Sequence, residues 1–165
     1  MDMKGKKVLV FGSGISGEAA ACLLLRENAQ VILYDGNENL NADEIVRKIK
    51  AARSGSEASA AEAGSDKDQL RVVLGDFPEE LLGEISLTVM SPGVPTDLPV
   101  VDKMREAGIP VWGEIELAYV LGKGDVLAIT GTNGKTTTTA LLGQIMANWK
   151  ESSFVVGNIG NPYTS

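Results

Sequence analysis

A lysine and a run of threonines in Gly131–Thr137, read G-T-N-G-K-T-T, have the clearest capacity for chemistry in this sequence. The apolar run Val126–Ile129 before them predicts a short buried strand, and Lys135 begins a segment that can be helical. A strand, a glycine-rich turn and a helix aim several backbone N–H groups at one point, where the helix dipole adds about half a positive charge. Lys135 adds a full positive charge, and the Thr136 hydroxyl is a hard oxygen ligand suited to Mg²⁺. The stretch therefore predicts a cradle for a nucleoside triphosphate.

The spacing of this motif differs from that of the general phosphate-binding loop. Two residues separate Gly131 from Gly134, whereas the general motif has four between its glycines. The alternative is an ordinary strand–turn–helix connection that carries a surface lysine. The Lys-Thr pair and the threonine run have no evident packing purpose, which favours phosphate binding.

A second glycine-rich turn, Gly12–Gly17 (G-S-G-I-S-G), follows the apolar run Lys7–Phe11. A helix from 15 to about 27 and a strand over Val31–Tyr34 are expected next, with Asp35 about 20 residues past the first glycine. This order predicts a mononucleotide-binding βαβ unit. It does not choose among NAD, FAD and a UDP-sugar, and a turn of this kind without any ligand remains the alternative.

Two further turns follow apolar runs that predict strands. Ser91-Pro92-Gly93-Val94-Pro95 comes after Leu87–Met90, and Gly157-Asn158-Ile159-Gly160 comes after Phe154–Val156. Open α/β sheets bind ligands at the carboxyl ends of their strands, so both turns are candidate ligand contacts. A plain tight turn, with the Asn158 amide satisfying its own backbone, is the alternative in each case.

Composition excludes several classes of function. The proportions of hydrophobic residues (44%) and charged residues (22%) are typical of an ordinary globular protein. A net charge of −7 leaves no basic stripe for nucleic acid, and no apolar run approaches the ~20 residues that a membrane span needs. The apolar stretch Val8–Phe11 is too short for a secretory signal, so we expect a cytoplasmic protein. No histidine is present to form a catalytic triad or a histidine–metal site, and the one cysteine, Cys22, is expected to be a buried structural thiol.

The remaining pattern predicts an α/β protein with two domains. Residues 1–113 are expected to form a Rossmann-like parallel-sheet domain, and 114–124 a linker helix and hinge. Residues 125–165 are expected to be only the start of a second, P-loop ATPase-type α/β domain, because a domain normally needs about 50 residues or more. The segment Ser54–Asp68, rich in Ser, Ala, Gly and Glu, is expected to be a mobile surface insertion.

Other helices and strands are expected from periodicity and turn residues. Ile45, Ile49 and Ala52 mark the buried side of one helix, and Leu141, Leu142, Ile145 and Met146 mark the inward side of another. The remaining predicted helical segments are Ala42–Arg53, Phe77–Leu82, Pro99–Ala107, Gly113–Leu121 and Thr137–Trp149, and the remaining predicted strands are Arg71–Leu74 and Pro110–Trp112.

The whole chain resembles the amino-terminal part of the Mur ligases, the ATP-dependent amide-forming enzymes of peptidoglycan synthesis. Gly131–Thr137 matches the ATP loop of that family, which sister ligases and folylpolyglutamate synthases share. The combination of Gly12–Gly17, the S-P-G-V of 91–94, Gly113–Leu117 (G-E-I-E-L) and Gly157–Gly160 resembles most the branch that adds D-glutamate.

The resemblance implies a role for each matching residue. Lys135 would hold the β- and γ-phosphates of ATP and Thr136 would ligate Mg²⁺, so both are the expected catalytic residues. The implied ATP-binding residues are Gly131, Thr132, Asn133, Gly134, Lys135, Thr136 and Thr137. The implied residues for the UDP-linked substrate are Gly14, Ile15, Ser16, Asp35, Gly36, Asn37, Ser91, Pro92, Gly93 and Asn158. Asn37 stands where the family often has Arg or Lys.

The implied reaction has two steps. The γ-phosphoryl group of ATP passes to the carboxylate of UDP-N-acetylmuramoyl-L-alanine, and the amine of D-glutamate then displaces phosphate from the acyl phosphate. The rest of the machinery is expected beyond Ser165, so the 165-residue chain alone is expected to be inactive, and we expect a monomer. A nicotinamide-dependent oxidoreductase and a non-catalytic UDP-sugar-binding module are the competing interpretations.

Overall fold

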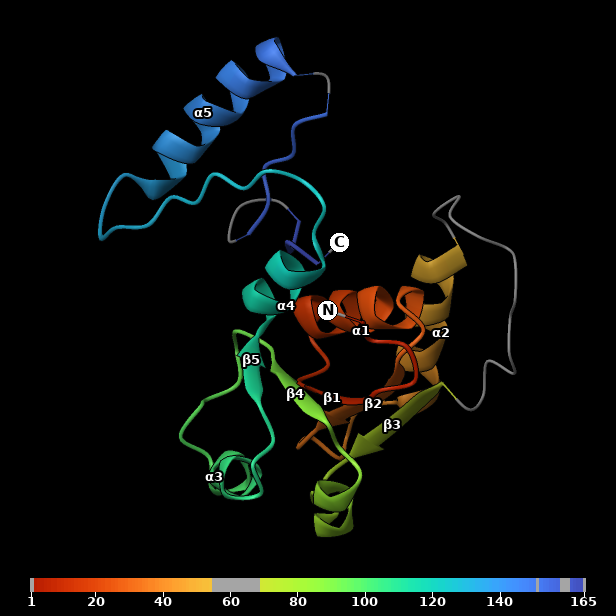
Figure 1. The fold of residues 1–165 in the computed structure, drawn as a ribbon. Coiled ribbons are helices and arrows are strands. Elements are labelled where there is room, and N and C mark those ends of the chain that lie inside the picture. Colours follow the sequence, from red (N-terminus) through yellow and green to blue (C-terminus); the bar gives the residue numbers. More distant parts are fainter. Residues whose placement is uncertain (1, 55–68, 151, 158–160, 165) are drawn as a thin grey trace.

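A five-stranded, all-parallel sheet lies between two layers of helices (Figure 1). The computed structural model describes residues 2–54, 69–150, 152–157 and 161–164. The strands are β1 (Lys7–Phe11), β2 (Gln30–Asp35), β3 (Leu70–Leu74), β4 (Leu87–Met90) and β5 (Val111–Gly113). Their order in the sheet is β3-β2-β1-β4-β5. The Rossmann-like fold expected for the amino-terminal part of the chain is therefore confirmed.

The strand order contains one reversal, between β1 and β4. The chain runs outward from β1 to β2 and β3, then crosses back to place β4 on the other side of β1. Phe11 pairs with Met90 at the end of both strands, so Gly12 and Ser91 leave the sheet side by side. Such a reversal opens a crevice at the carboxyl edge of the sheet, and open α/β folds bind their ligands there.

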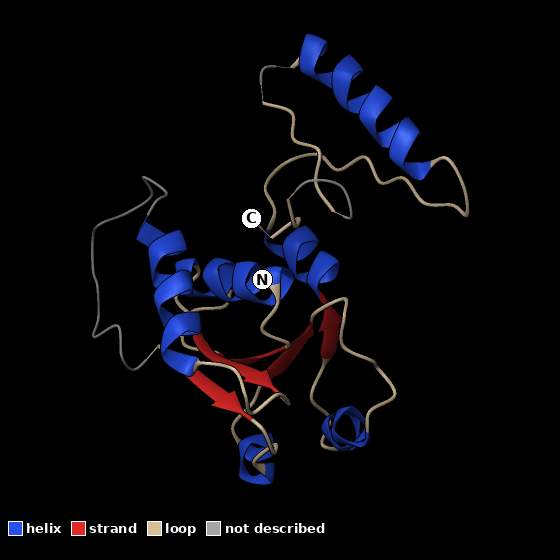
Figure 2. Ribbon diagram, turned by 180° about the vertical axis from the view of Figure 1, so that it is seen from behind, coloured by secondary structure: helices blue, strands red, loops and turns tan. Residues whose placement is uncertain are grey.

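Three helices cover one face of the sheet and two helical segments cover the other (Figure 2). The first layer contains α1 (Ile15–Arg26), α2 (Ala42–Ser54) and α4 (Glu114–Leu121), and the second contains the 3₁₀ helix η1 (Glu79–Gly83) and α3 (Pro99–Glu106). Val8 and Val10 of β1 face the first layer, whereas Leu9 and Phe11 face the second. Because side chains alternate along a strand, burial of both faces requires the continuous apolar runs that the sequence shows.

The predicted elements of this sheet domain are confirmed to within a few residues. The prediction that Cys22 is a buried thiol is also confirmed, since Cys22 is 5% exposed and its Sγ donates a hydrogen bond to Ile49 O at 3.4 Å. Ile45 and Ile49 face the core as expected. The expectation for Ala52 is wrong, because its side chain is exposed, although Arg26 of α1 donates a hydrogen bond to its carbonyl at 3.5 Å.

The predicted strand Val126–Ile129 is wrong, because these residues form an irregular segment. Val126 and Leu127 are 42% and 61% exposed. The prediction for Phe154–Val156 is wrong in the same way, since Val156 makes only an isolated bridge to Asn161. Among the described residues no strand pairs with either run, and a strand is stable only when neighbours accept and donate its backbone hydrogen bonds.

The helix predicted over Thr137–Trp149 is present as α5 (Lys135–Trp149), which stands apart from the sheet (Figure 1). Its predicted inward side is not buried. Leu141 and Ile145 are 58% and 55% exposed, and Leu142 and Met146 are half-buried. None of the residues of α5 is buried, although Val155 lies against Gly143 of this helix.

The predicted division at 113 and 124 remains a prediction. The segment 114–124 does begin with a helix, and α4 places Leu117, fully buried, in the same core as α1. The predicted insertion at 54–68 falls almost entirely outside the described residues. Within the described part of the chain, no helix is both long enough and apolar enough to cross a membrane.

Candidate functional site

A cleft of about 380 Å³ lies at the carboxyl edge of the sheet, where the strand order reverses. The turn after β1, the last residue of β2 and the turn after β4 form its walls. The lining residues are Gly12, Ser13, Gly14, Ile15, Ser16, Asp35, Ser91, Pro92, Gly93 and Val94. Seven of the ten residues predicted to bind the UDP-linked substrate thus lie around one cavity.

Close packing holds the first wall of the cleft in place. Gly12 has a φ of +99°, and a Cβ there would lie 2.8 Å from Val94 Cγ2. The Ser91 hydroxyl is buried and donates a hydrogen bond to Gly12 O at 3.2 Å. A Cβ on Gly17 would lie only 1.8 Å from Gly12 O, so α1 begins in direct contact with the turn. Glycine is therefore required at 12 and 17 for geometric reasons.

The first turn of α1 supplies the hydrogen-bond donors of the cleft. Glu18 N donates to Gly14 O at 2.9 Å, but none of the described residues accepts the N–H groups of Ile15, Ser16 or Gly17. These donors, together with the positive end of the helix dipole, are suited to an anion. The described residues that line the cleft include no lysine or arginine, so these would hold an anion through backbone donors.

Among the described residues that line the cleft, Asp35 alone is ionisable, and three hydrogen bonds already engage its carboxylate. Oδ2 accepts from Ser13 N at 2.9 Å and from Ser13 Oγ at 2.7 Å, and Oδ1 accepts from Asn37 N at 3.0 Å. Burial alone would raise the pKa of Asp35, but these hydrogen bonds outweigh burial and hold the pKa below its ordinary value. The carboxylate is therefore ionised at neutral pH and is bound to the glycine-rich turn.

The remaining predicted substrate residues lie beside the cleft or outside the described part of the chain. Gly36 and Asn37 are exposed and follow Asp35 directly, without lining the cavity. The Asn37 side-chain oxygen accepts a hydrogen bond from Asn39 N at 3.1 Å, so it is used within its own turn. Asn158 lies outside the described residues. Ile15 is 79% exposed at the rim, where it can cover a bound ligand.

Ser13 is the residue that the sequence interpretation missed, although it lies inside the glycine motif. Its hydroxyl faces Asp35, 22 positions further along the chain. In a parallel βαβ unit the first turn lies next to the end of the second strand. A hydroxyl in that turn and a carboxylate at that strand end are therefore a signal that the sequence already contains.

The predicted triphosphate cradle lies at the start of α5 and contributes nothing to the cleft. Gly131 and Gly134 have φ values of +145° and +74°, which other residues rarely adopt. Thr138 N donates to Gly134 O at 2.9 Å, whereas the described residues offer no acceptor to the N–H groups of the three residues before Thr138. The Lys135 ammonium donates to Gly131 O and, at 3.3 Å, to Thr132 O.

This donor set fits a polyphosphate. Backbone N–H groups, one ammonium and the dipole of a 15-residue helix converge at the turn, and residues 131–137 are all exposed. The Thr136 hydroxyl is a suitable single ligand for a phosphate-bound Mg²⁺. Among the described residues no group of three or more His, Cys, Asp or Glu side chains forms a metal site, so the ion would rely on phosphate oxygens, water and further ligands.

Comparison with known proteins identifies the family. Residues 6–113 match a family model described as the N-terminal domain of the MurD-like Mur ligases. The chain belongs to the MurD-like Mur ligases. This MurD-like chain is 52% identical over 164 residues to a protein of Lachnospira eligens, and 49% identical over 164 residues to one of Lachnoclostridium phytofermentans. Both are named UDP-N-acetylmuramoylalanine–D-glutamate ligase, and each alignment covers 99% of this chain and 33% of the relative.

Solved structures support the fold of the MurD-like chain. A murein peptide ligase from Psychrobacter arcticus matches with a TM-score of 0.53 and 19% identity, over 87% of this chain and 26% of that one. A pseudomurein peptide ligase from Methanothermus fervidus matches with a TM-score of 0.52 and 20% identity, over the same shares. At this identity the likeness concerns the fold alone. The chain spans about a third of the length of its curated relatives.

Proposed function

We propose that this chain is the part of a D-glutamate-adding Mur ligase that binds the UDP-linked substrate and contributes the ATP loop. The full-length protein would join D-glutamate to UDP-N-acetylmuramoyl-L-alanine through an acyl phosphate. The observation that carries this proposal is the cleft between β1 and β4. It lies in a chain with 52% and 49% sequence identity to proteins named for that reaction. ATP and UDP-linked substrates are cytoplasmic compounds, so we also propose a cytoplasmic location. A monomeric enzyme is a separate part of the proposal.

In this proposal the cleft holds uridine diphosphate. The N–H groups at Gly14, Ile15 and Ser16 would bind the diphosphate, because they lie together at the cleft and none of the described residues accepts them. The strand end at Asp35, with Gly36 and Asn37, would flank the uracil. Pro92 and Gly93 are exposed at the rim and would contact the substrate, whereas Ser91 would act by supporting the turn. Asn158 would contact the sugar-phosphate portion of the UDP-linked substrate.

The ATP loop would act by placing positive charge against the transferred phosphoryl group. Lys135 would hold the β- and γ-phosphates, the N–H groups of Gly131–Thr137 would surround them, and Thr136 would ligate Mg²⁺. Spreading charge over these groups lets one carboxylate oxygen approach a polyanion. The Lys135 ammonium now shares its hydrogens with two loop carbonyls, which keeps it beside the site it would serve.

Two measurements test the proposal. Phosphate release by the full-length protein should require ATP, Mg²⁺, UDP-N-acetylmuramoyl-L-alanine and D-glutamate together, and L-alanine, L-lysine or glycine should not replace D-glutamate. Release that depends equally on another amino acid would refute the substrate assignment. Calorimetric titration should show binding of UDP and none of NAD. Binding of NAD alone would instead favour an oxidoreductase.

A further inference from the structure

Ser13 holds the Asp35 carboxylate through two of its own atoms. The backbone N–H and the hydroxyl of Ser13 donate to the same oxygen, Oδ2, while Asn37 N donates to Oδ1. The protein therefore uses three of the roughly four acceptor positions of the carboxylate before any ligand binds. Hydrogen bonds to an ionised acceptor are shorter and stronger than neutral ones.

The same contact fixes the direction of the donors that follow. The Ser13 N–H points to Asp35, and Gly12 is held from the other side by the hydrogen bond from Ser91 Oγ to its carbonyl. The turn is thus anchored to both neighbouring strand ends, β2 through Asp35 and β4 through Ser91. With the turn fixed at these two points, the N–H groups of the first turn of α1 remain directed away from the protein's own acceptors.

We propose that Ser13 is a positioning residue that commits Asp35 to the protein scaffold and so prepares the cleft for a nucleoside diphosphate. In dinucleotide-binding folds the acid at the end of the second strand accepts hydrogen bonds from a ribose hydroxyl. Here Ser13 supplies both donors to Oδ2 and Asn37 N one donor to Oδ1, which leaves about one acceptor position for a ribose hydroxyl. The cleft therefore favours ligands that bind through their phosphates. It disfavours ligands whose ribose hydroxyls must donate hydrogen bonds to Asp35. This inference rests on the proposed function.

A double-mutant cycle on UDP affinity in the full-length protein tests the inference. Ser13→Ala should weaken UDP binding about tenfold, because it removes one charge-assisted hydrogen bond that orders the turn. Asp35→Asn should weaken binding to a similar extent. If Ser13 acts through Asp35, the double variant should be little weaker than either single variant. Ser13→Thr keeps a hydroxyl and should restore most of the affinity.

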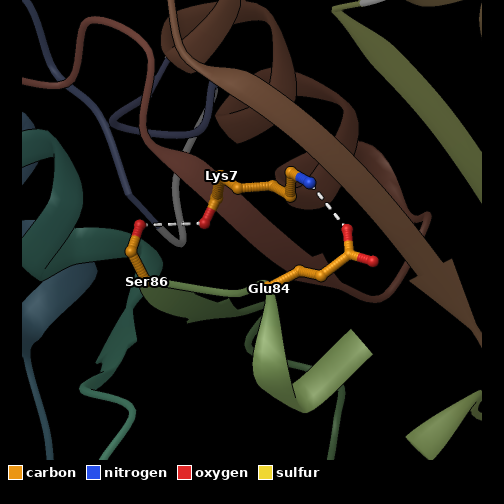
Figure 3. Close-up of polar contacts among 3 residues, drawn as sticks. All are labelled: Lys7, Glu84 and Ser86. Atoms are coloured by element: carbon orange, nitrogen blue, oxygen red, sulfur yellow. Dashed lines mark hydrogen bonds and ion pairs between the residues drawn. The ribbon is translucent and has the colours of Figure 1, made fainter. Parts of the chain in front are cut away.

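Ser86→Ala is the matched control, at the opposite edge of the same sheet. The Ser86 hydroxyl donates to Lys7 O at 3.0 Å, beside the ion pair between Lys7 and Glu84 (2.6 Å), at the amino ends of β1 and β4 (Figure 3). This variant also loses one serine hydrogen bond to a distant part of the chain, but its UDP affinity should equal that of the wild type.

Each outcome decides the inference. UDP affinity of Ser13→Ala equal to that of Ser86→Ala would overturn it, as would fully multiplicative effects in the double variant. In kinetic assays Ser13→Ala should raise KM for the UDP-linked substrate and leave KM for ATP unchanged, so an equal rise in both overturns the assignment. If Ser13→Ala does not fold, a folded Asp35→Asn with wild-type UDP affinity has the same consequence. A wild-type protein that binds no UDP would instead refute the proposed function.

Discussion

Gly17→Ala should damage both the stability of the fold and the cleft, although alanine is the better helix former. The added Cβ would lie 1.8 Å from Gly12 O and 2.8 Å from Ser91 Oγ, whereas real Cβ atoms essentially never come within 3.0 Å of another heavy atom. The nearest atom belongs to the backbone of the turn, so no side-chain rotation relieves the contact. Helix α1 must move away from the turn by about 1 Å or more.

The balance of two effects sets the size of the loss. Replacing glycine by alanine inside a helix gains about 0.5–1 kcal/mol of stability. Overpacking a well-filled site costs about 1–3 kcal/mol, and a backbone contact as short as this one belongs at the upper end. We therefore expect Gly17→Ala to lower the free energy of unfolding by about 2 kcal/mol, which lowers Tm by about 5–10 °C in a domain of this size.

Urea and thermal unfolding, followed by circular dichroism, measure this loss directly. Gly83→Ala is the control, because a Cβ at Gly83 meets nothing within 4 Å, and its stability should change by less than about 0.5 kcal/mol. A second comparison separates folding from binding. Gly14 also faces open space, so Gly14→Ala should keep its stability while its new methyl group obstructs an anion at the adjacent N–H groups. Wild-type stability and UDP affinity in Gly17→Ala would refute the reasoning.

Three further predictions concern Cys22, Lys135 and Asp35. Burial raises the pKa of the Cys22 thiol, partly offset by Arg26, so iodoacetamide should modify the folded protein about 100-fold more slowly than the urea-unfolded protein; equal rates would contradict the packing. Lys135→Ala in the full-length protein should reduce the rate of phosphate release about 100-fold or more and leave UDP affinity unchanged. The reason is that the ammonium attracts a phosphate oxygen ~4 Å away by about 4 kcal/mol before desolvation. An unaffected rate would remove Lys135 from the mechanism. Burial opposes ionisation of Asp35, but its hydrogen bonds outweigh burial and lower the pKa of the carboxyl in the folded state. These hydrogen bonds therefore add folding stability that is complete above the ordinary pKa of 3.8. This stability is lost as the pH falls through the pKa of the folded state. The stability difference between wild type and Ser13→Ala should therefore disappear in acid titrations, and a difference that persists at the lowest pH would contradict this origin.

Local patterns were sufficient to predict the sheet domain because each of its elements carries its own signal. Lys7–Phe11 alternates between two buried faces, Gly12–Gly17 has the glycines that the turn requires, and Cys22 lies in a run of small apolar residues. The register between β1 and β4 has no such local signal. It depends on pairing between residues about 80 positions apart, so the position of Ser91 against Gly12 became evident only in the structure.

The candidate site was predicted as a set of residues and not as a set of hydrogen bonds. Asp35 was expected beside a ligand, and the structure instead gives its carboxylate three protein donors. Which acceptors a carboxylate leaves free depends on neighbours in space, and residue type alone does not specify them. Ser13 was treated as an unspecified position between two glycines, although it supplies two of those three donors.

The failed prediction of a strand at Val126–Ile129 follows from the difference between preference and pairing. Four apolar or β-branched residues fit a pleated, buried surface, but propensity of this kind measures packing against neighbours on that surface. The preference becomes a strand only when another strand supplies backbone donors and acceptors. The described residues supply none there, so Val126 and Leu127 remain exposed. The glycine-rich turn and α5 need only local hydrogen bonds, such as that from Thr138 N to Gly134 O, and they form as expected. The donor geometry of the proposed ATP loop is therefore encoded locally, whereas its support depends on contacts distant in sequence.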